Sequence, residues 1–256
     1  FPRSGLLGDA GSLSDGAERE SSGARVAQRG AHGRRNPKIY RNMRKYWLTR
    51  DGNPGLILFM LGWAADHHAV EHLAPEGYDM LCVYDYRTLE PFAAEEFSAY
   101  RNVTLFAWSF GVWAAERTCR DVASDCAVAL GGTPYPVDDR FGIPRRAFLA
   151  TLRGLRGSGA ETFNRRAYGA DYDRLAPFFD ERPFEDKLDE LGVLFERSAE
   201  PYTPSLDWTA AVVGDRDAIF PPANMLAYWK EKAVVKPLPH YPFGDPGIVS
   251  GYLKKD

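Results

Sequence analysis

The stretch Val103-Thr-Leu-Phe-Ala-Trp-Ser109-Phe-Gly111-Val-Trp-Ala-Ala-Glu116 decides the fold of this chain. Its first part is an apolar run typical of a buried β-strand, and the part after Gly111 has the composition of a helix. Ala107 and Gly111, two residues before and two after Ser109, are small enough to let the chain turn sharply from strand to helix. Such a turn lifts the serine hydroxyl above a sheet edge, although S-x-G also occurs by chance in ordinary loops.

An α/β-hydrolase places an acid and then a histidine after this serine, each on a loop behind a later strand. The chain has both residues in this order. The run Thr209 to Val213 reads as a buried strand and leads into a loop that contains Asp217. The next run, Ala233 to Leu238, ends just before His240. By itself His240 could be a surface histidine beside a proline, and the order of serine, acid and histidine favours a catalytic role.

The loop after the first of these strands contains two acids, Asp215 and Asp217. We prefer Asp217 because it stands three positions after Gly214, the usual spacing of this loop. The predicted catalytic residues are therefore Ser109 as nucleophile, His240 as base and Asp217 as the acid that orients the imidazole.

Short apolar runs alternate with helical segments from Tyr46 onward, which is typical of a mainly parallel sheet with helices on both faces. The expected strands are Gly55 to Leu61, Met80 to Tyr84, Val103 to Trp108, Cys126 to Leu130, Ala210 to Val213 and Ala233 to Leu238. Between the fourth and fifth strands the expected elements are helices, at Arg145 to Leu155, Ala160 to Tyr168, Tyr172 to Phe179 and Phe184 to Ser198. The sequence thus predicts an α/β-hydrolase fold over residues 43–256, with a helical cap at about 135–205 over the serine.

Residues 1–42 are rich in Gly, Ser, Ala and Arg and lack an apolar periodicity. We expect a disordered or mis-assigned N-terminal extension there. A targeting peptide is the alternative, and the four acids of this segment count against it.

Composition limits the function classes. With 256 residues, 45% of them hydrophobic, the chain can bury one large core or two modest ones. A net charge of −3 argues against general nucleic-acid binding. The three cysteines show neither CxxC spacing nor pairing, so we expect reduced thiols and a cytoplasmic protein. No apolar run approaches the roughly 20 residues that span a bilayer, so no membrane is expected as a partner.

Ester hydrolysis needs two N–H donors aimed at the developing oxyanion. The backbone N–H of Phe110, next to the serine, is one candidate. The N–H of Trp63 is the other, because Leu61-Gly62-Trp63 follows the first buried strand. Trp63 could instead be an ordinary core aromatic.

Three histidines, His67, His68 and His72, raise the question of a metal site, since the last two stand four residues apart on one helix face. The segment lacks the paired glutamate of a zinc-hydrolase helix. We therefore predict no metal and no cofactor.

Residues 140–166 contain seven arginines and a single acid, Glu161. Arg145, Arg146, Arg153 and Arg156 recur at spacings that place several on one helical face, which suits a phosphate or carboxylate partner. A solvated helix face, or pairing with the acidic stretch 171–200, are the alternatives. A positive surface beside the active-site mouth would steer an acidic partner toward it.

Further motifs extend over residues 45 to 245: Gly62-Trp63, Tyr84-Asp85-Tyr86, Ala107 to Trp113, Phe141-Gly142-Ile143-Pro144, Phe163-Asn164-Arg165-Arg166, Arg182-Pro183-Phe184, Asp217 to Phe220 and Pro222-Ala223-Asn224. In these motifs the chain resembles the BioG-type pimeloyl-[acyl-carrier protein] methyl ester esterases of bacterial biotin synthesis. Two departures stand out. Ala64 follows Trp63 where the family often has glycine, and the family shows nothing like residues 1–42.

The resemblance implies a serine esterase that hydrolyses the methyl ester of pimeloyl-[acyl-carrier protein] and releases methanol. Acyl carrier protein is strongly acidic, so it is the partner implied for the four arginines. Arg165 and Arg166 match a paired-arginine motif of the family that could also be structural. The alternatives are a generalist carboxylesterase or thioesterase on small acyl esters, and a non-catalytic binding protein, which has no need of all three catalytic residues.

Overall fold

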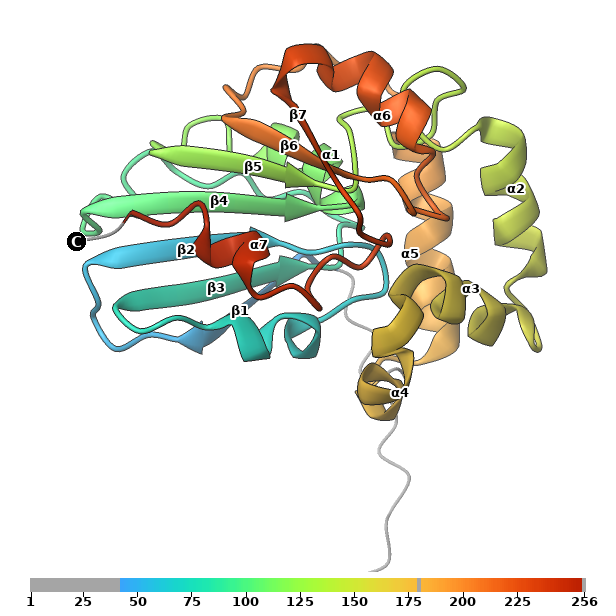
Figure 1. Ribbon diagram of the computed structural model, residues 1–256, viewed down its shortest axis with the longest axis horizontal. Helices are drawn as coiled ribbons and strands as arrows, with labels where there is room; N and C mark the ends of the chain where they lie inside the picture. Colours follow the sequence, from blue (N-terminus) through green and yellow to red (C-terminus); the bar gives the residue numbers. More distant parts are fainter. Residues whose placement is uncertain (1–41, 179–180, 255–256) are drawn as a thin grey trace, which may run out of the picture. The chain divides into compact units, whose positions relative to one another are not determined.

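The computed structural model describes residues 42–178 and 181–254, which contain a seven-stranded sheet (Figure 1). The order of the strands is β1-β3-β2-β4-β5-β6-β7, and all neighbours are parallel except the antiparallel pair β1–β3. The strands are β1 (Arg44–Thr49), β2 (Gly55–Met60), β3 (Tyr78–Tyr84), β4 (Asn102–Trp108), β5 (Cys126–Leu130), β6 (Ala210–Gly214) and β7 (Ala233–Lys236). The predicted mainly parallel sheet is confirmed.

All six predicted strands are present, and the sequence interpretation missed β1 at the sheet edge. This strand pairs only with β3, and its residues are exposed or half-buried, so it lacks the continuous apolar run of a central strand. The last strand, β7, ends at Lys236, two residues earlier than expected. Pro237 follows it, and proline cannot donate a ladder hydrogen bond.

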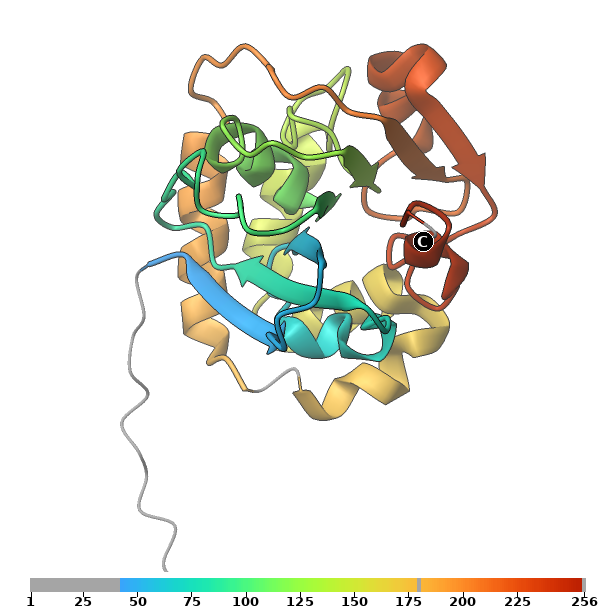
Figure 2. The same ribbon diagram turned by 90° about the vertical axis from the view of Figure 1, so that its left-hand side faces the viewer.

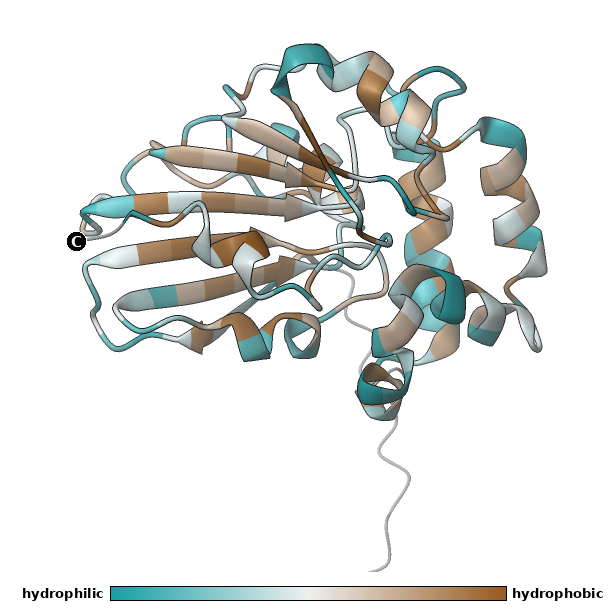
Figure 3. Ribbon diagram, in the orientation of Figure 1, coloured by the Kyte–Doolittle hydropathy of each residue, from teal (hydrophilic) through white to brown (hydrophobic). Residues whose placement is uncertain are grey.

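Two hydrophobic cores cover the two faces of the sheet, because successive side chains of a strand point to opposite sides. Leu58 of β2 packs in one core with Trp113 of α1 (Phe110–Thr118) and Leu194 of α5 (Phe184–Arg197). Phe59, its neighbour, packs in the other core, together with residues of α7 (Gly247–Ser250). Figure 2 accordingly shows α1 and α5 on one side of the sheet and α7 on the other, and Figure 3 shows the apolar residues concentrated in the central strands.

Among the described residues between β5 and β6 there are four α-helices: α2 (Arg145–Gly154), α3 (Gly159–Tyr168), α4 (Tyr172–Leu175) and α5. They gather beyond the carboxyl ends of the parallel strands (Figure 1), and residues 145–197 are called the cap below. The helix expected at Tyr172 to Phe179 consists of α4 and a 3₁₀ turn, Ala176–Phe178; Phe179 lies outside the described residues. We keep the division into a hydrolase domain and a cap as our interpretation.

The extension expected at residues 1–42 lies, up to residue 41, outside the described residues. Among the helices of the described part, none combines the length and the apolar composition that a membrane span requires.

Candidate active site

Ser109 occupies a strained turn between the end of β4 and the start of α1. Its backbone has φ 57° and ψ −123°, a conformation that costs energy for any residue with a Cβ atom. Gly111 makes the turn possible, because a Cβ atom there would overlap the carbonyl oxygen of Met60 in β2. The helix thus begins close against the neighbouring strand, and the serine stands at the edge of the sheet.

The structure brings Ser109, His240 and Asp217 together from loops that follow β4, β7 and β6. Nε2 of His240 lies 3.1 Å from Oγ of Ser109, and Nδ1 lies 2.8 Å from Oδ2 of Asp217. All three residues are buried. This is the geometry of a nucleophile, a base and an acid that orients the base.

The acid is held by its own loop. Oδ1 of Asp217 accepts hydrogen bonds of 2.8 Å from the backbone N–H groups of both Ile219 and Phe220. Oδ2 remains directed at the histidine. Asp215, the other acid of the loop, is exposed and lies 3.7 Å from the Arg216 guanidinium. The structure therefore favours Asp217 over Asp215 as the partner of the imidazole.

Two aromatic residues that the sequence interpretation did not assign hold His240 in place. The indole Nε1 of Trp108 donates a 2.8 Å hydrogen bond to the His240 carbonyl oxygen. The ring of Phe220 lies parallel to the imidazole, with 6.1 Å between centroids. Trp108 directly precedes Ser109 in the sequence and Phe220 stands three residues after Asp217, and this closeness to predicted catalytic residues is the signal that could have found them.

A cavity of about 460 Å³ opens above the serine, between the sheet and the cap. Ser109 and His240 lie in its floor, and Phe148 of α2 and Phe163 of α3 lie in its walls. The facing surfaces of α2 and α3 bring mostly small or apolar residues to it: Ala147, Ala150, Thr151, Gly154, Gly159 and Thr162. Arg166 also lines the cavity, which therefore suits a mostly apolar ligand with a polar group near one of its walls.

The two predicted oxyanion donors also line this cavity. No described group accepts a hydrogen bond from the backbone N–H of Trp63 or Phe110, so both donors remain available to a ligand. Ala64, which follows Trp63, has φ 63°. Glycine adopts this conformation without strain and alanine does not, so the departure of Ala64 from the family pattern leaves a strained residue in this loop.

The four predicted partner-binding arginines are all exposed and have different surroundings. Arg145 lies over the ring of Phe195, and Arg156, which follows α2, pairs with Glu185 at 2.9 Å. Among the described residues, Arg146 and Arg153 have no acidic partner. Internal pairing, one alternative from the sequence, thus applies to Arg156. Arg165 likewise pairs with Glu161, and Arg166 donates to the Ala218 carbonyl oxygen.

The histidines do not form the pair that the sequence spacing suggested. Nε2 of His72 contacts the Phe243 carbonyl oxygen at 2.8 Å, whereas Nδ1 and Nε2 of His68 contact Glu71 and Glu181 at 2.9 and 3.2 Å. Potential metal-ligand atoms do come together within 4.8 Å at Asp66, His67 and His68. Since both ring nitrogens of His68 already face carboxylates, the prediction of no metal is kept.

Comparisons with known proteins show the family to which the chain belongs. The family model described as "Pimeloyl-ACP methyl esterase BioG" matches residues 43–244. The crystal structure of BioG from Haemophilus influenzae is 37% identical, with a TM-score of 0.70, and the match covers 79% of this chain and 95% of that one.

A second relative is the malonyl-[acyl-carrier protein] O-methyltransferase of Bacteroides fragilis, 33% identical over 68% of this chain but only 36% of its own length. The fold itself also resembles an α/β-hydrolase enzyme from a Medee basin deep-sea metagenome library. That match has 14% identity and a TM-score of 0.55, and it covers 85% of this chain and 98% of the other. The predicted α/β-hydrolase fold is confirmed.

Proposed function

Since the chain belongs to the pimeloyl-ACP methyl esterase BioG family, we propose that it hydrolyses the methyl ester of pimeloyl-[acyl-carrier protein]. The products would be methanol and the free carboxylate, still attached to its carrier. The observation that carries the proposal is the chain of contacts Ser109–His240–Asp217 at the floor of an apolar cavity.

The mechanism follows from these contacts. Nε2 of His240 takes the proton of Ser109 as Oγ attacks the ester carbonyl, and Asp217 stabilises the imidazolium that forms. The backbone N–H groups of Trp63 and Phe110 are proposed to bind the oxyanion. His240 then gives the proton to the departing methoxide, so methanol leaves. A water molecule, activated by the same histidine, attacks the acyl-enzyme, releases the carboxylic acid and returns the proton to Ser109.

The cavity lining supports an ester as substrate and an acid as product. A methylene chain that ends in a methyl ester is uncharged and matches the apolar surfaces of Phe148 and Phe163. The carboxylate product is charged, and Arg166 in the cavity lining is a cation that can pair with it.

Two exposed arginines of the cap support an acidic carrier as the partner. Arg146 and Arg153 stand on α2, which also lines the cavity, and neither has an acidic partner among the described residues. Their charge is therefore available to carboxylates of another molecule. The name of the Bacteroides fragilis relative also points to a carrier-bound substrate. Cys82, Cys119 and Cys126 are free thiols, which favours a cytoplasmic location for the reaction.

The test is hydrolysis of the carrier-bound methyl ester by the full chain, beside free monomethyl pimelate and a short p-nitrophenyl ester. A higher kcat/KM for the carrier-bound ester would support the proposal. Equal or faster turnover of the small esters would instead favour a generalist esterase. Ser109→Ala should reduce hydrolysis to background while the protein stays folded, and clear residual activity would mean that another group is the nucleophile.

A double charge reversal separates carrier recognition from chemistry. Arg146→Glu with Arg153→Glu should lower kcat/KM for the carrier-bound ester and leave the p-nitrophenyl ester unaffected. The matched control is Arg101→Glu with Arg120→Glu, which changes the net charge equally at exposed positions near the amino end of β4 and the carboxyl end of α1. If both double variants behave alike on the carrier-bound ester, the cap arginines do not recognise the carrier.

A further inference from the structure

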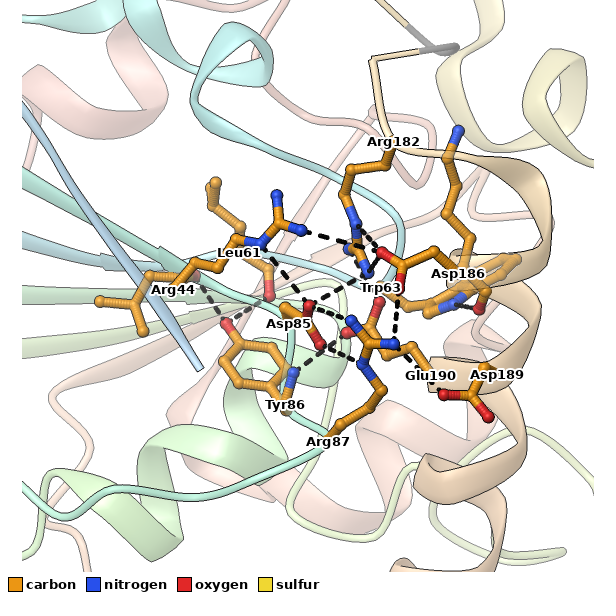
Figure 4. Close-up of polar contacts among 12 residues, drawn as sticks. Arg44, Leu61, Trp63, Asp85, Tyr86, Arg87, Arg182, Asp186, Asp189 and Glu190 are labelled. Atoms are coloured by element: carbon orange, nitrogen blue, oxygen red, sulfur yellow. Dashed lines mark hydrogen bonds and ion pairs between the residues drawn. The ribbon is translucent and has the colours of Figure 1, made fainter. Parts of the chain in front are cut away.

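Buried charged residues outside the catalytic site join the cap helix α5 to the turn after β3 (Figure 4). None of them is more than 9% exposed, and two of the motifs noted in the sequence contribute to them. We call this group the ion cluster; its members are Asp85, Arg87, Arg182, Asp186 and Glu190. The mechanism above uses none of these residues.

Short contacts connect the cluster across the two elements. The Arg87 guanidinium donates to Asp85 at 2.8 and 2.6 Å and to Asp186 at 2.6 Å. Arg182 donates to Glu190 at 2.9 Å and lies 3.3 Å from Asp186. Burial raises the pKa of the Glu190 carboxyl above its ordinary value, although the positive charge of Arg182 opposes that effect. Such a group fixes the relative position of two elements, because each ion tolerates little displacement once it is buried.

The ion cluster reaches the predicted oxyanion loop through Tyr86. Oε1 of Glu190 accepts a 3.1 Å hydrogen bond from the backbone N–H of Tyr86, whose side chain is completely buried. The Tyr86 hydroxyl lies 2.7 Å from the carbonyl oxygen of Leu61 and 2.9 Å from that of Val83, and it shares its proton between them. Leu61 begins the segment Leu61-Gly62-Trp63 that carries the Trp63 donor.

Helix α5 holds the other end of this segment directly. The indole Nε1 of Trp63 donates a 2.8 Å hydrogen bond to the Lys187 carbonyl oxygen. Gly62, between the two attached residues, lines the cavity. Ala64, the next residue after Trp63, is held at φ 63°, and strain of this kind persists only where the surroundings impose it. The loop is thus restrained at Leu61 by Tyr86, which α5 contacts through Glu190, and at Trp63 by α5 itself.

We propose that Tyr86, held by Glu190 and the ion cluster, is a positioning residue that sets the direction of the Trp63 backbone N–H toward the oxyanion. The inference rests on the proposed esterase function and assigns α5 a part in it beyond covering the cavity. An oxyanion donor stabilises the transition state only when it is preorganised, and loss of one donor lowers kcat by about 10²–10³-fold. A misdirected donor should therefore lower kcat by about 10–100-fold.

Tyr86→Phe tests the proposal because it removes the hydroxyl and keeps the ring in the core. With a p-nitrophenyl ester we expect kcat to fall by about 10–100-fold and KM to change by less than about twofold. The affinity for an alkylboronic acid, which forms a tetrahedral adduct with a catalytic serine, should fall by a similar factor. Backbone amide exchange at Leu61 and Ala65, whose N–H groups donate to the carbonyl oxygens of Val83 and Gly62, should also become faster.

Tyr100→Phe is the matched control. Its hydroxyl donates a 2.9 Å hydrogen bond to the buried carboxylate of Asp79. Asp79 lies in β3 and pairs with Leu56, near the amino end of β2. This variant should lose stability with no change in kcat or in boronic-acid affinity. If Tyr86→Phe behaves in the same way, the ion cluster is only structural and the proposal is overturned.

Trp63→Phe provides a second test if Tyr86→Phe does not fold. It removes the hydrogen bond to Lys187 and should also lower kcat and boronic-acid affinity together; unchanged values would overturn the proposal. These outcomes are distinct from failure of the carrier assignment. A generalist esterase would still lose kcat in both variants, because the oxyanion loop serves any ester.

Discussion

At the scale of single residues, the site depends on a backbone conformation that few side chains permit. Ser109 is held at φ 57° by the start of α1, and α1 approaches β2 only because residue 111 is glycine. The strain at Ser109 is maintained by this close packing. Small residues around Ser109 are therefore required by sterics, independently of any role in chemistry.

Gly111→Ala should destabilise the protein by about 1–3 kcal/mol or more, because its Cβ atom would overlap the backbone of Met60. Urea denaturation measures the change. Gly192→Ala is the control: this glycine lies within α5, and a Cβ atom there would have no neighbour within 4 Å. That substitution should stabilise the helix by up to about 1 kcal/mol. Equal midpoints of urea unfolding for the two variants would contradict the steric explanation.

At the scale of elements, the cap helix α5 is attached to the sheet by buried charges as well as by an apolar face. The same helix places Leu191 and Leu194 in the core and Asp186 and Glu190 in the ion cluster. A buried ion pair contributes little net stability, but removing one partner leaves the other buried and unpaired. The attachment of the cap should therefore be sensitive to single changes.

Arg182→Met should lower the free energy of unfolding by about 3–5 kcal/mol, because Glu190 would lose its nearest cation in a buried site. The comparison is Arg156→Met in the exposed pair Arg156–Glu185, where about 0–1 kcal/mol is expected. Chemical denaturation of both variants gives the two values. A small loss for Arg182→Met would mean that water or a neighbouring cation replaces the guanidinium.

A second contact between elements should depend on pH. His68 stacks on Phe178 of the cap at 4.0 Å and faces Glu71 and Glu181. Burial lowers the pKa of His68, but the hydrogen bond to Glu71 and the charges of Asp66 and Glu181 outweigh it, so the pKa lies above its ordinary value of 6.5. Folding then favours protonated His68. Its contribution to stability is full below about pH 6.5 and is lost as the pH rises through the folded-state pKa.

His68→Gln should therefore cost more stability at pH 6 than at pH 9, as measured by urea unfolding at both values. In a Glu71→Gln background, the cost of His68→Gln should depend less on pH, since one of the charges that raise the pKa of His68 is removed. A cost that is the same at both pH values would show that the imidazole acts only through packing.

At the scale of the whole molecule, the cap helix α2 carries exposed positive charge, and the same helix lines the cavity. Arg146 and Arg153 are exposed on α2, whereas the chain as a whole has a net charge of −3. A local field of opposite sign to the net charge can orient an acidic partner toward one face of the molecule.

For this reason kcat/KM for the carrier-bound ester should fall by about tenfold between low and high salt, since added ions screen the arginines. Turnover of the p-nitrophenyl ester should change by less than about twofold, because no charged carrier takes part in that reaction. Parallel assays from 20 to about 500 mM NaCl measure both. A carrier reaction that is insensitive to salt would argue against electrostatic recognition.

Much of the fold and the candidate site could be predicted from the sequence, because both are encoded by local patterns. The apolar run before Ser109 and the small residues around it predict strand, turn and helix. Parallel strands end at one edge of a sheet, so the order of Ser109, Asp217 and His240 on loops behind such strands was enough to expect them close together. The preference for Asp217 over Asp215 followed from its spacing after Gly214 and from the family motif that continues through Ile219 and Phe220, and the hydrogen bonds of its loop agree with it.

Only the tertiary structure decided the rest. The edge strand β1 has one neighbour and half-exposed residues, so it carries no strong local pattern. The difference between Arg156, which is paired, and Arg146, which is not, depends on where α5 packs. The Tyr86–Glu190 contact joins residues 104 positions apart, and no periodicity within either segment encodes it. Burial patterns are local properties of a sequence, whereas contacts between distant polar groups arise only when separate elements have packed together.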